Sequence, residues 1–410
     1  MNKALNPYFL FLHIFVISWS SVLRLSDWAP LPFLFLLLAT LFCFISYVLR
    51  SFSTDTYPIH ISRVDYCILF SLFLMALSAI FQPTLKSFNY LLAYSSVFGC
   101  YLLLLALESR PINIQNLLKV NYYAINFICI FIILEVGGRF ITGENIFEWI
   151  PRTREATATV TIGLYRAYGL ATEPTQLGNY FCCFFPFAIY YAQQNNNKYF
   201  SFYLLFLFFA ALLTFSAAMF LVSFSSLILF YIFTENKAKI FSQMMIIGLS
   251  FGLIALIFVN YLDLGEVLEG VLSTLTDKIF NREGISSIQR LDALALGLKD
   301  IANNPFLGKG LGAAGSKDLS SNINWYIFLG AEGGLIILFL FVFWFGFHFV
   351  HAVINFLETK DNIYLVSAIA IYGGMAYFIF LSTFQNLFLL TSIFFYRLIL
   401  RSALLSKKGV

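Results

Sequence analysis

The sequence predicts an all-α polytopic membrane protein with about 12 transmembrane helices and two long outward loops. Hydrophobic residues make up 60% of the 410 residues, whereas soluble domains contain about 45–50%. Charged residues make up 11%, against about 25% in soluble domains. Apolar runs of about 20 residues, the length that crosses a bilayer, recur along the chain. A soluble protein could not bury this much apolar surface, whereas lipid accommodates it.

The apolar runs divide the chain into spans within a single membrane domain that covers residues 1–410. The boundary between the seventh and eighth runs, around Ser216 to Ala218, is also compatible with one bent helix. The spans are expected near residues 7–24, 30–49, 65–82, 87–107, 120–141, 177–194, 199–215, 218–234, 240–262, 325–349, 362–383 and 386–405.

Lys and Arg in the connections predict the orientation, because cytoplasmic connections carry the excess of both. With the N-terminus inside, the outward short connections carry mainly Arg24 and Lys86, and both termini are cytoplasmic. The inward connections and ends carry Lys3, Arg50, Arg63, Arg110, Lys119, Lys198, Lys237, Lys239, Lys360, Lys407 and Lys408.

Two connections are long, and both then face outward. The first covers residues 142–176, and the second covers residues 263–324. Apolar residues recur at helical spacing in two stretches of the second loop, at 264–280 and 286–304. These stretches are predicted to form amphipathic helices that lie along the membrane surface.

The first loop ends with an arginine and a glutamate just before a span. Arg166 and Glu173 lie seven residues apart, Pro174 suits the first turn of a helix, and Thr172 could cap that helix. A helix N-terminus beside a guanidinium group suits an anion such as phosphate. From local chemistry alone, an Arg–Glu ion pair that orients the loop is the simpler interpretation.

The second loop carries further arginines and a glycine-rich segment. Arg282 and Arg290 could meet Arg166 on one diphosphate, or they could be solvated charges. Gly310, Gly312 and Gly315 spell G-x-G-x-x-G, but a dinucleotide fingerprint needs a soluble βαβ unit around it. A tight turn at the membrane surface is the better interpretation of these glycines.

The sequence does not indicate a metal site, nucleic-acid binding or catalysis by histidine in the long loops. The residues His13, His60, His348 and His351 lie outside both long loops and form no metal-ligand set. The adjacent Cys182 and Cys183 are typical of packing residues inside an apolar helix. Runs of Lys and Arg that would bind nucleic acid are absent from the sequence.

The two loops carry short motifs that resemble those of O-antigen polymerases, within the superfamily of O-antigen polymerases and ligases. In the first loop, Arg166 is followed by Glu173-Pro174-Thr175, similar to the family's Arg and Glu-Pro-Ser/Thr pattern. The second loop resembles the family's Arg followed by Asn-Pro-x-x-Gly-x-Gly, and then His-Asn-x-Tyr with Ala-Glu-x-Gly. The matching residues are Arg290, Asn304, Pro305, Gly308, Gly310, Asn324, Tyr326, Ala331, Glu332 and Gly334.

One departure from the family pattern separates its two activities. Ligases of the superfamily carry a catalytic histidine immediately before the Asn, where this chain has Ile323. Isoleucine cannot take a proton, so the resemblance favours a polymerase over a ligase.

The resemblance implies a GT-C-like glycosyltransferase of the bacterial inner membrane, with both long loops in the periplasm. It would move a glycan from undecaprenyl diphosphate onto the next lipid-linked repeat unit, with no cofactor or metal. Glu173 would accept the acceptor's proton, while Arg166 and Arg290 would neutralise the leaving diphosphate. The expected substrate-binding residues are Arg282, Asn324, Tyr326, Gly308 and Gly310.

The expected partners are undecaprenyl-diphosphate-linked oligosaccharides, a chain-length regulator and a flippase. Two further functions stay open at this point, a transporter or flippase of lipid-linked oligosaccharides and a non-catalytic scaffold. A transporter would favour internal repeats and charges at mid-membrane, and the sequence shows neither. The expected product is a bacterial surface polysaccharide, and O-antigen, capsule and exopolysaccharide stay open as alternatives.

Overall fold

A computed structural model gives the architecture of the chain. It describes residues 6–19, 22, 31–51, 61–81, 83–107, 112–150, 160–161, 164–171, 173–195, 199–214, 216–233, 242, 285–313, 324–380 and 387–407.

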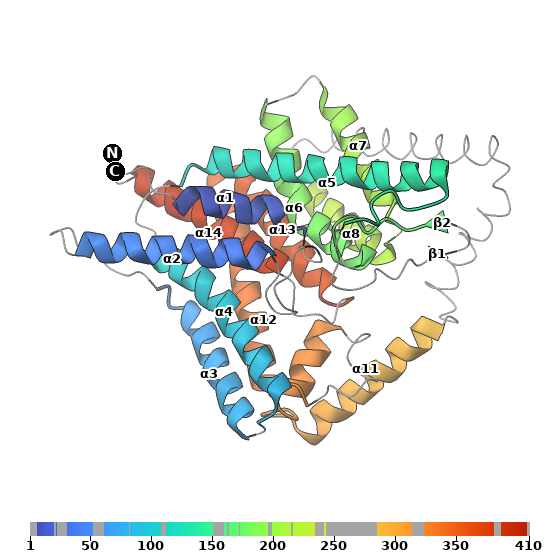
Figure 1. The fold of residues 1–410 in the computed structure, drawn as a ribbon. Helices are drawn as coiled ribbons and strands as arrows, with labels where there is room; N and C mark the ends of the chain where they lie inside the picture. Colours follow the sequence, from blue (N-terminus) through green and yellow to red (C-terminus); the bar gives the residue numbers. More distant parts are fainter. Residues whose placement is uncertain are drawn as a thin grey trace.

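The described residues are almost entirely helical (Figure 1). A short antiparallel hairpin, β1 (Val160–Thr161) and β2 (Leu164–Tyr165), interrupts the first long loop. The helices are α1 (Asn6–Val16), α2 (Leu31–Ser51), α3 (Asp65–Phe81), α4 (Leu85–Leu107), α5 (Ile114–Thr142), α6 (Pro174–Asn195), α7 (Phe200–Leu212), α8 (Ala217–Phe233), α11 (Ile285–Asn303), α12 (Trp325–Thr359), α13 (Asn362–Tyr377) and α14 (Leu387–Lys407).

Four of the described helices, α2, α4, α5 and α12, are long and apolar enough to cross a membrane. Every span expected from the sequence contains a helix, except 240–262, which lies outside the described residues apart from residue 242. The seventh and eighth runs form two helices, because α7 ends at Leu212 and α8 begins at Ala217. The prediction of an all-helical chain with membrane-spanning segments is confirmed to this extent.

Helix α11 is the second amphipathic stretch predicted in the large loop. Its packing partner is α12, and in Figure 1 it runs along the lower right. One end lies near the turn between α3 and α4, and the other points toward β1–β2 and the end of α5. The C-terminal end of α14 lies on the opposite, upper-left side of that view. The first amphipathic stretch, at 264–280, lies outside the described residues.

Helix α13 forms the centre of the bundle and packs against α6, α8, α12 and α14. Its glycines allow this close approach. A Cβ on Gly373 would lie 2.6 Å from the carbonyl oxygen of Cys182, and a Cβ on Gly374 would lie 3.0 Å from the Cys183 sulfur. Both cysteines are buried and free. Small residues commonly let helix backbones meet in this way within a membrane, so Cys182 and Cys183 occupy packing positions.

A buried polar network joins α1, α2, α4 and α14. His13 Nδ1 lies 2.6 Å from the carbonyl oxygen of Pro32, and His13 Nε2 lies 2.9 Å from the Tyr101 hydroxyl. A carbonyl can only accept, so Nδ1 carries the proton and Nε2 accepts from Tyr101. The Tyr101 hydroxyl also contacts the hydroxyl of Thr391. The imidazole therefore links these helices, which is a structural role.

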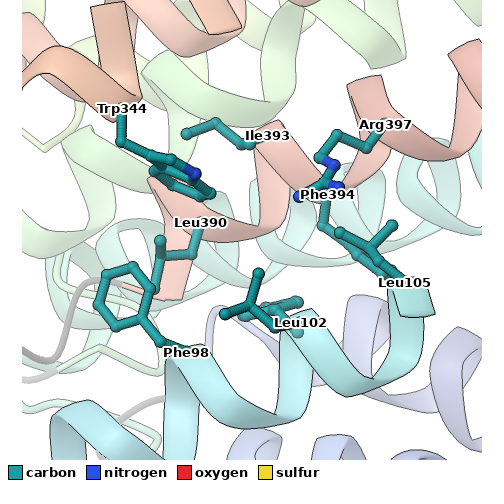
Figure 2. Close-up of a pocket in the computed structure, with 9 residues that line it drawn as sticks. Phe98, Leu102, Leu105, Trp344, Leu390, Ile393, Phe394 and Arg397 are labelled. Carbon is teal, nitrogen blue, oxygen red and sulfur yellow. The ribbon is translucent and has the colours of Figure 1, made fainter. Parts of the chain in front are cut away.

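A second buried network lies where α3, α12 and α14 meet. Asp65 Oδ1 accepts hydrogen bonds from Arg397 at 2.6 Å and from Trp344 Nε1 at 3.2 Å. Figure 2 shows Arg397 and Trp344 on the wall of a small pocket, whose other lining residues are mainly apolar and come from α4 and α14. Because Asp65 neutralises Arg397, the pocket presents no uncompensated charge, and we interpret it as packing space.

Helix α12 folds back on itself at Gly334. In an unbroken helix, Trp325 and Phe341 would lie about 24 Å apart, yet their ring centroids are 5.7 Å apart. The Trp325 ring also lies 5.8 Å from the ring of Phe345. Gly334 has φ 84° and ψ 168°, which is not helical. The segment Trp325–Gly333 is therefore a short half-helix that packs along the long helix Leu335–Thr359, instead of forming its outer end.

The bend at Gly334 is held by the turn that follows α11. Lys309 N–H donates to the Ala331 carbonyl at 2.8 Å, and Gly310 N–H donates to the Glu332 carbonyl at 3.0 Å. In return, Leu335 N–H donates to the Pro305 carbonyl at 2.7 Å. These bonds satisfy backbone groups that the break in the helix would otherwise leave unpaired. The salt bridge between Lys309 and the buried Asp300 of α11 ties the turn to its own helix.

Glycine is required on both sides of this contact. A Cβ on Gly334 would collide with the carbonyl oxygen of Phe306, and a Cβ on Gly308 would collide with that of Glu332. Both glycines also have positive φ, which L side chains rarely adopt. The backbones can meet only if both side chains are absent.

We predict that Gly334→Ala lowers the free energy of unfolding by about 3 kcal/mol or more, because the methyl group meets backbone at positive φ. Gly346→Ala is the matched control on the same helix, since a Cβ there meets nothing within 4 Å. Thermal unfolding of the purified protein in detergent compares the two variants. Equal unfolding midpoints would contradict the fold-back of α12.

Candidate functional site

The segment Arg166–Ala171 connects the β1–β2 hairpin to α6 and is anchored on the junction between α7 and α8. Ala167 N–H donates to the Leu213 carbonyl at 3.0 Å. Arg166 is partly buried, and its Nε donates to the Thr214 carbonyl at 3.4 Å. The guanidinium group is thus held by backbone from a helix pair that is distant in sequence.

Helix α5 holds the same segment from another side. Gly169 N–H donates to Glu135 Oε2 at 2.9 Å, and Glu135 is 0% exposed. Gly169 has φ 57°, in the left-handed region. The Tyr168 hydroxyl accepts a hydrogen bond from Asn145 Nδ2 at 2.9 Å. Residues 167–171 are therefore a buried segment that hydrogen bonds hold in place.

Glu173 lies directly at the N-terminus of α6, as the sequence predicted. Its carbonyl accepts from Gln176 N–H at 3.1 Å and from Leu177 N–H at 3.3 Å, and its side chain is exposed. Pro174 is the first helical residue, where its missing N–H has no cost. Thr172, the expected cap, lies outside the described residues. The carboxylate is thus accessible beside the positive end of a helix dipole.

The α7–α8 junction also contacts α6 and α13. The Ser216 hydroxyl lies 2.9 Å from the Tyr377 hydroxyl, and Tyr377 is completely buried. Gly178 of α6 makes room for this pair, because a Cβ there would collide with the Tyr377 hydroxyl and lie 3.1 Å from Ser216 Oγ. The start of α6, the junction and the end of α13 therefore share one region.

The half-helix of α12 begins in the same region. Trp325 N–H donates to the Phe378 carbonyl at 2.9 Å, and the Tyr326 hydroxyl donates to the Met375 carbonyl at 2.7 Å. Asn324 caps the half-helix, since its side chain accepts from Ile327 N–H at 2.8 Å. The N–H groups of Trp325 and Ile327, two of the first three in the half-helix, are thereby satisfied.

The end of α13 thus links the two loop-derived segments that the sequence singled out. Arg166 and Glu173 approach it through the α7–α8 junction and α6, whereas Asn324 and Tyr326 contact it directly or through their neighbours. Tyr326 uses its hydroxyl on Met375, and Asn324 uses its side chain on Ile327. Their expected role in substrate binding stays a prediction, and the structure adds a packing role to each.

The remaining predicted residues lie elsewhere. Gly308 and Gly310 pack against the far end of the half-helix, at Glu332 and Gly334. Arg290 lies in α11, and its side chain is outside the described part of the structure, as is the whole of Arg282. The structure therefore places Tyr326 at the end of α13, Arg166 on the adjoining α7–α8 junction and Glu173 at the start of α6. It gives the two glycines a backbone-contact role.

The ion-pair interpretation of Arg166 and Glu173 can be compared with the described pairs. The ion pairs of the described helices and turns include Lys309–Asp300 and Arg397–Asp65. Arg166 directs its Nε to a carbonyl, and Glu173 stays exposed. Within this part of the chain, no group of three His, Cys, Asp or Glu side chains is placed to hold a metal ion.

Sequence reasoning missed several residues of this region. Glu135 accepts the Gly169 N–H, a contact between residues 34 positions apart that the sequence does not indicate. Ser216 and Tyr377 were not singled out, because a serine and a tyrosine inside apolar runs give no signal on their own. A pairwise contact between residues 161 positions apart is invisible without the fold.

Comparison of the sequence with models of known protein families finds no match, and comparison with curated proteins finds none. The function is therefore argued from the residues and their geometry.

We predict that Gly178→Ala destabilises the protein, because the new methyl group displaces the Tyr377 hydroxyl and breaks its contact with Ser216. Gly99→Ala is the control, since a Cβ there meets nothing within 4 Å. Adding Tyr377→Phe to Gly178→Ala removes the colliding oxygen, so part of the lost thermal stability should return. A double variant that is no more stable than Gly178→Ala alone would contradict this packing.

Proposed function

We propose that the protein is an inner-membrane polymerase of a bacterial surface polysaccharide. It would transfer a growing glycan from undecaprenyl diphosphate to a hydroxyl of the next lipid-linked repeat unit. The observation that carries the proposal is that the α7–α8 junction, which binds Arg166, and the segment Asn324–Tyr326 both contact the end of α13. The motif resemblance supplies the reaction, and the geometry supports the choice of site.

The proposed topology has about 12 spans, with both termini in the cytoplasm and both long loops in the periplasm. In Figure 1 the α3–α4 turn, α11, the end of α5 and the β1–β2 hairpin lie toward one side, and the end of α14 lies toward the other. This arrangement supports placing both loops on one face of the membrane. A site on that face is accessible to lipid-linked sugars whose tails stay in the bilayer.

The chemistry assigns one role to each charged residue. Glu173 accepts the proton of the acceptor hydroxyl, and the oxygen forms a bond to the anomeric carbon of the donor glycan. The bond from that carbon to the diphosphate oxygen breaks, and undecaprenyl diphosphate leaves. Arg166 and Arg290 neutralise the negative charge that develops on it. The exposed carboxylate of Glu173 and the backbone-anchored guanidinium of Arg166 suit these roles.

A strain that lacks the protein tests the proposal. Its surface lipid should carry at most one repeat unit, because units are still made and transferred but not joined. Complementation with Glu173→Gln or Arg290→Ala should leave chains short at normal protein levels, whereas Glu148→Gln, an exposed carboxylate of the same loop, should restore long chains. Normal chain length with both Glu173→Gln and Arg290→Ala would reject this site.

The same strain separates the alternative functions. Loss of a ligase would remove the capped lipid altogether, and loss of a flippase would trap lipid-linked units on the cytoplasmic face. The motif position occupied by Ile323 disfavours the ligase, since isoleucine cannot transfer a proton. Two long outward loops with arginines are not needed by a flippase.

A further inference from the structure

Glu135 is a buried carboxylate that the proposed chemistry does not use. It lies in α5, is 0% exposed, and its Oε2 accepts the Gly169 N–H at 2.9 Å. A buried carboxylate is costly unless it is hydrogen-bonded, so this position needs a reason. Gly169 lies between Arg166 and Glu173 along the chain, which makes the bond a link between α5 and the proposed site.

We propose that Glu135 is a positioning residue, which fixes the connection between Arg166 and Glu173 by holding the Gly169 N–H. This inference rests on the proposed function of that site. Glu135 would not touch the substrate, but its loss would let Arg166 and Glu173 leave the geometry in which one faces the diphosphate and the other the hydroxyl.

The turn Gly169–Ala171 has little conformational freedom of its own. Gly169 has φ 57°, and a Cβ there would lie 3.5 Å from the side chain of Leu177 and 3.7 Å from that of Ile132. The neighbouring Leu170 and Ala171 are buried. The backbone N–H of Gly169 therefore points from a packed turn into α5, where Glu135 is the described acceptor.

Different hydrogen bonds fix the start, the middle and the end of the segment from Arg166 to Glu173. Ala167 and Arg166 bond to the α7–α8 junction, which fixes the start of the segment. Glu135 fixes its middle, and the first turn of α6 fixes its end at Glu173. Without Glu135, the two fixed ends would be joined by a turn whose central N–H has lost an acceptor. Misplacement of reacting groups by about 1 Å is enough to lower a rate 100-fold.

Substitution of Glu135 by glutamine and by leucine distinguishes a positioning role from a role of the negative charge and from a folding defect. Glu135→Gln keeps an oxygen that accepts the Gly169 N–H, whereas Glu135→Leu has a similar size and no acceptor. In membranes supplied with lipid-linked repeat units, Glu135→Leu should lower kcat about 100-fold with little change in KM. Glu135→Gln should keep most of kcat, and Glu148→Leu, at an exposed carboxylate of the same loop, should behave as wild type.

Each outcome has a definite meaning. Loss of activity in Glu135→Leu with recovery in Glu135→Gln, at equal protein level and equal thermal stability, supports the proposal. Equal inactivity of both variants overturns it in favour of a role for the charge itself. Full activity of Glu135→Leu overturns it as well. The proposed function fails separately, if wild-type membranes do not lengthen the glycan at all.

Discussion

The contact between two stretches of backbone, the turn Pro305–Gly310 and the bend Ala331–Leu335, is the constraint on which the site region depends. Hydrogen bonds run in both directions across it, and glycine at positions 308 and 334 lets the chains approach. Backbone groups in a bilayer must find partners inside the protein. The turn supplies them where α12 breaks, so the break costs little and the half-helix can fold back.

The fold-back places Asn324 to Tyr326 against the end of α13 instead of at the tip of a straight helix. That helix end also receives the α7–α8 junction through Tyr377, and the junction in turn holds Arg166. The second-loop segment therefore contacts α13 directly, whereas the first-loop segment is linked to it through the α7–α8 junction. The buried networks around His13 and Asp65 involve neither segment, and they serve the frame of helices.

Composition and apolar runs were enough to predict the helices, and amphipathic spacing predicted α11. Pro174 predicted the start of α6, because proline is favoured at the first position of a helix. The reversal of α12 could not be predicted, since residues 325–349 form one uninterrupted, mostly apolar run of span length. Gly333 and Gly334 were the only local signal, and glycine pairs also occur in straight spans. The bond from Glu135 to Gly169 and the role of Gly308 in backbone contact depend on neighbours that only the fold brings together.

The most direct test of the central claim is a reconstitution in nanodiscs that contain only this protein and a synthetic prenyl-diphosphate-linked repeat unit. Mass spectrometry of the lipid-linked products over time follows chain growth. The account predicts a ladder that rises by one repeat unit per step, with one prenyl diphosphate released at each step. Unchanged single units beside active, folded protein would contradict it, and so would hydrolysis of the donor without chain growth.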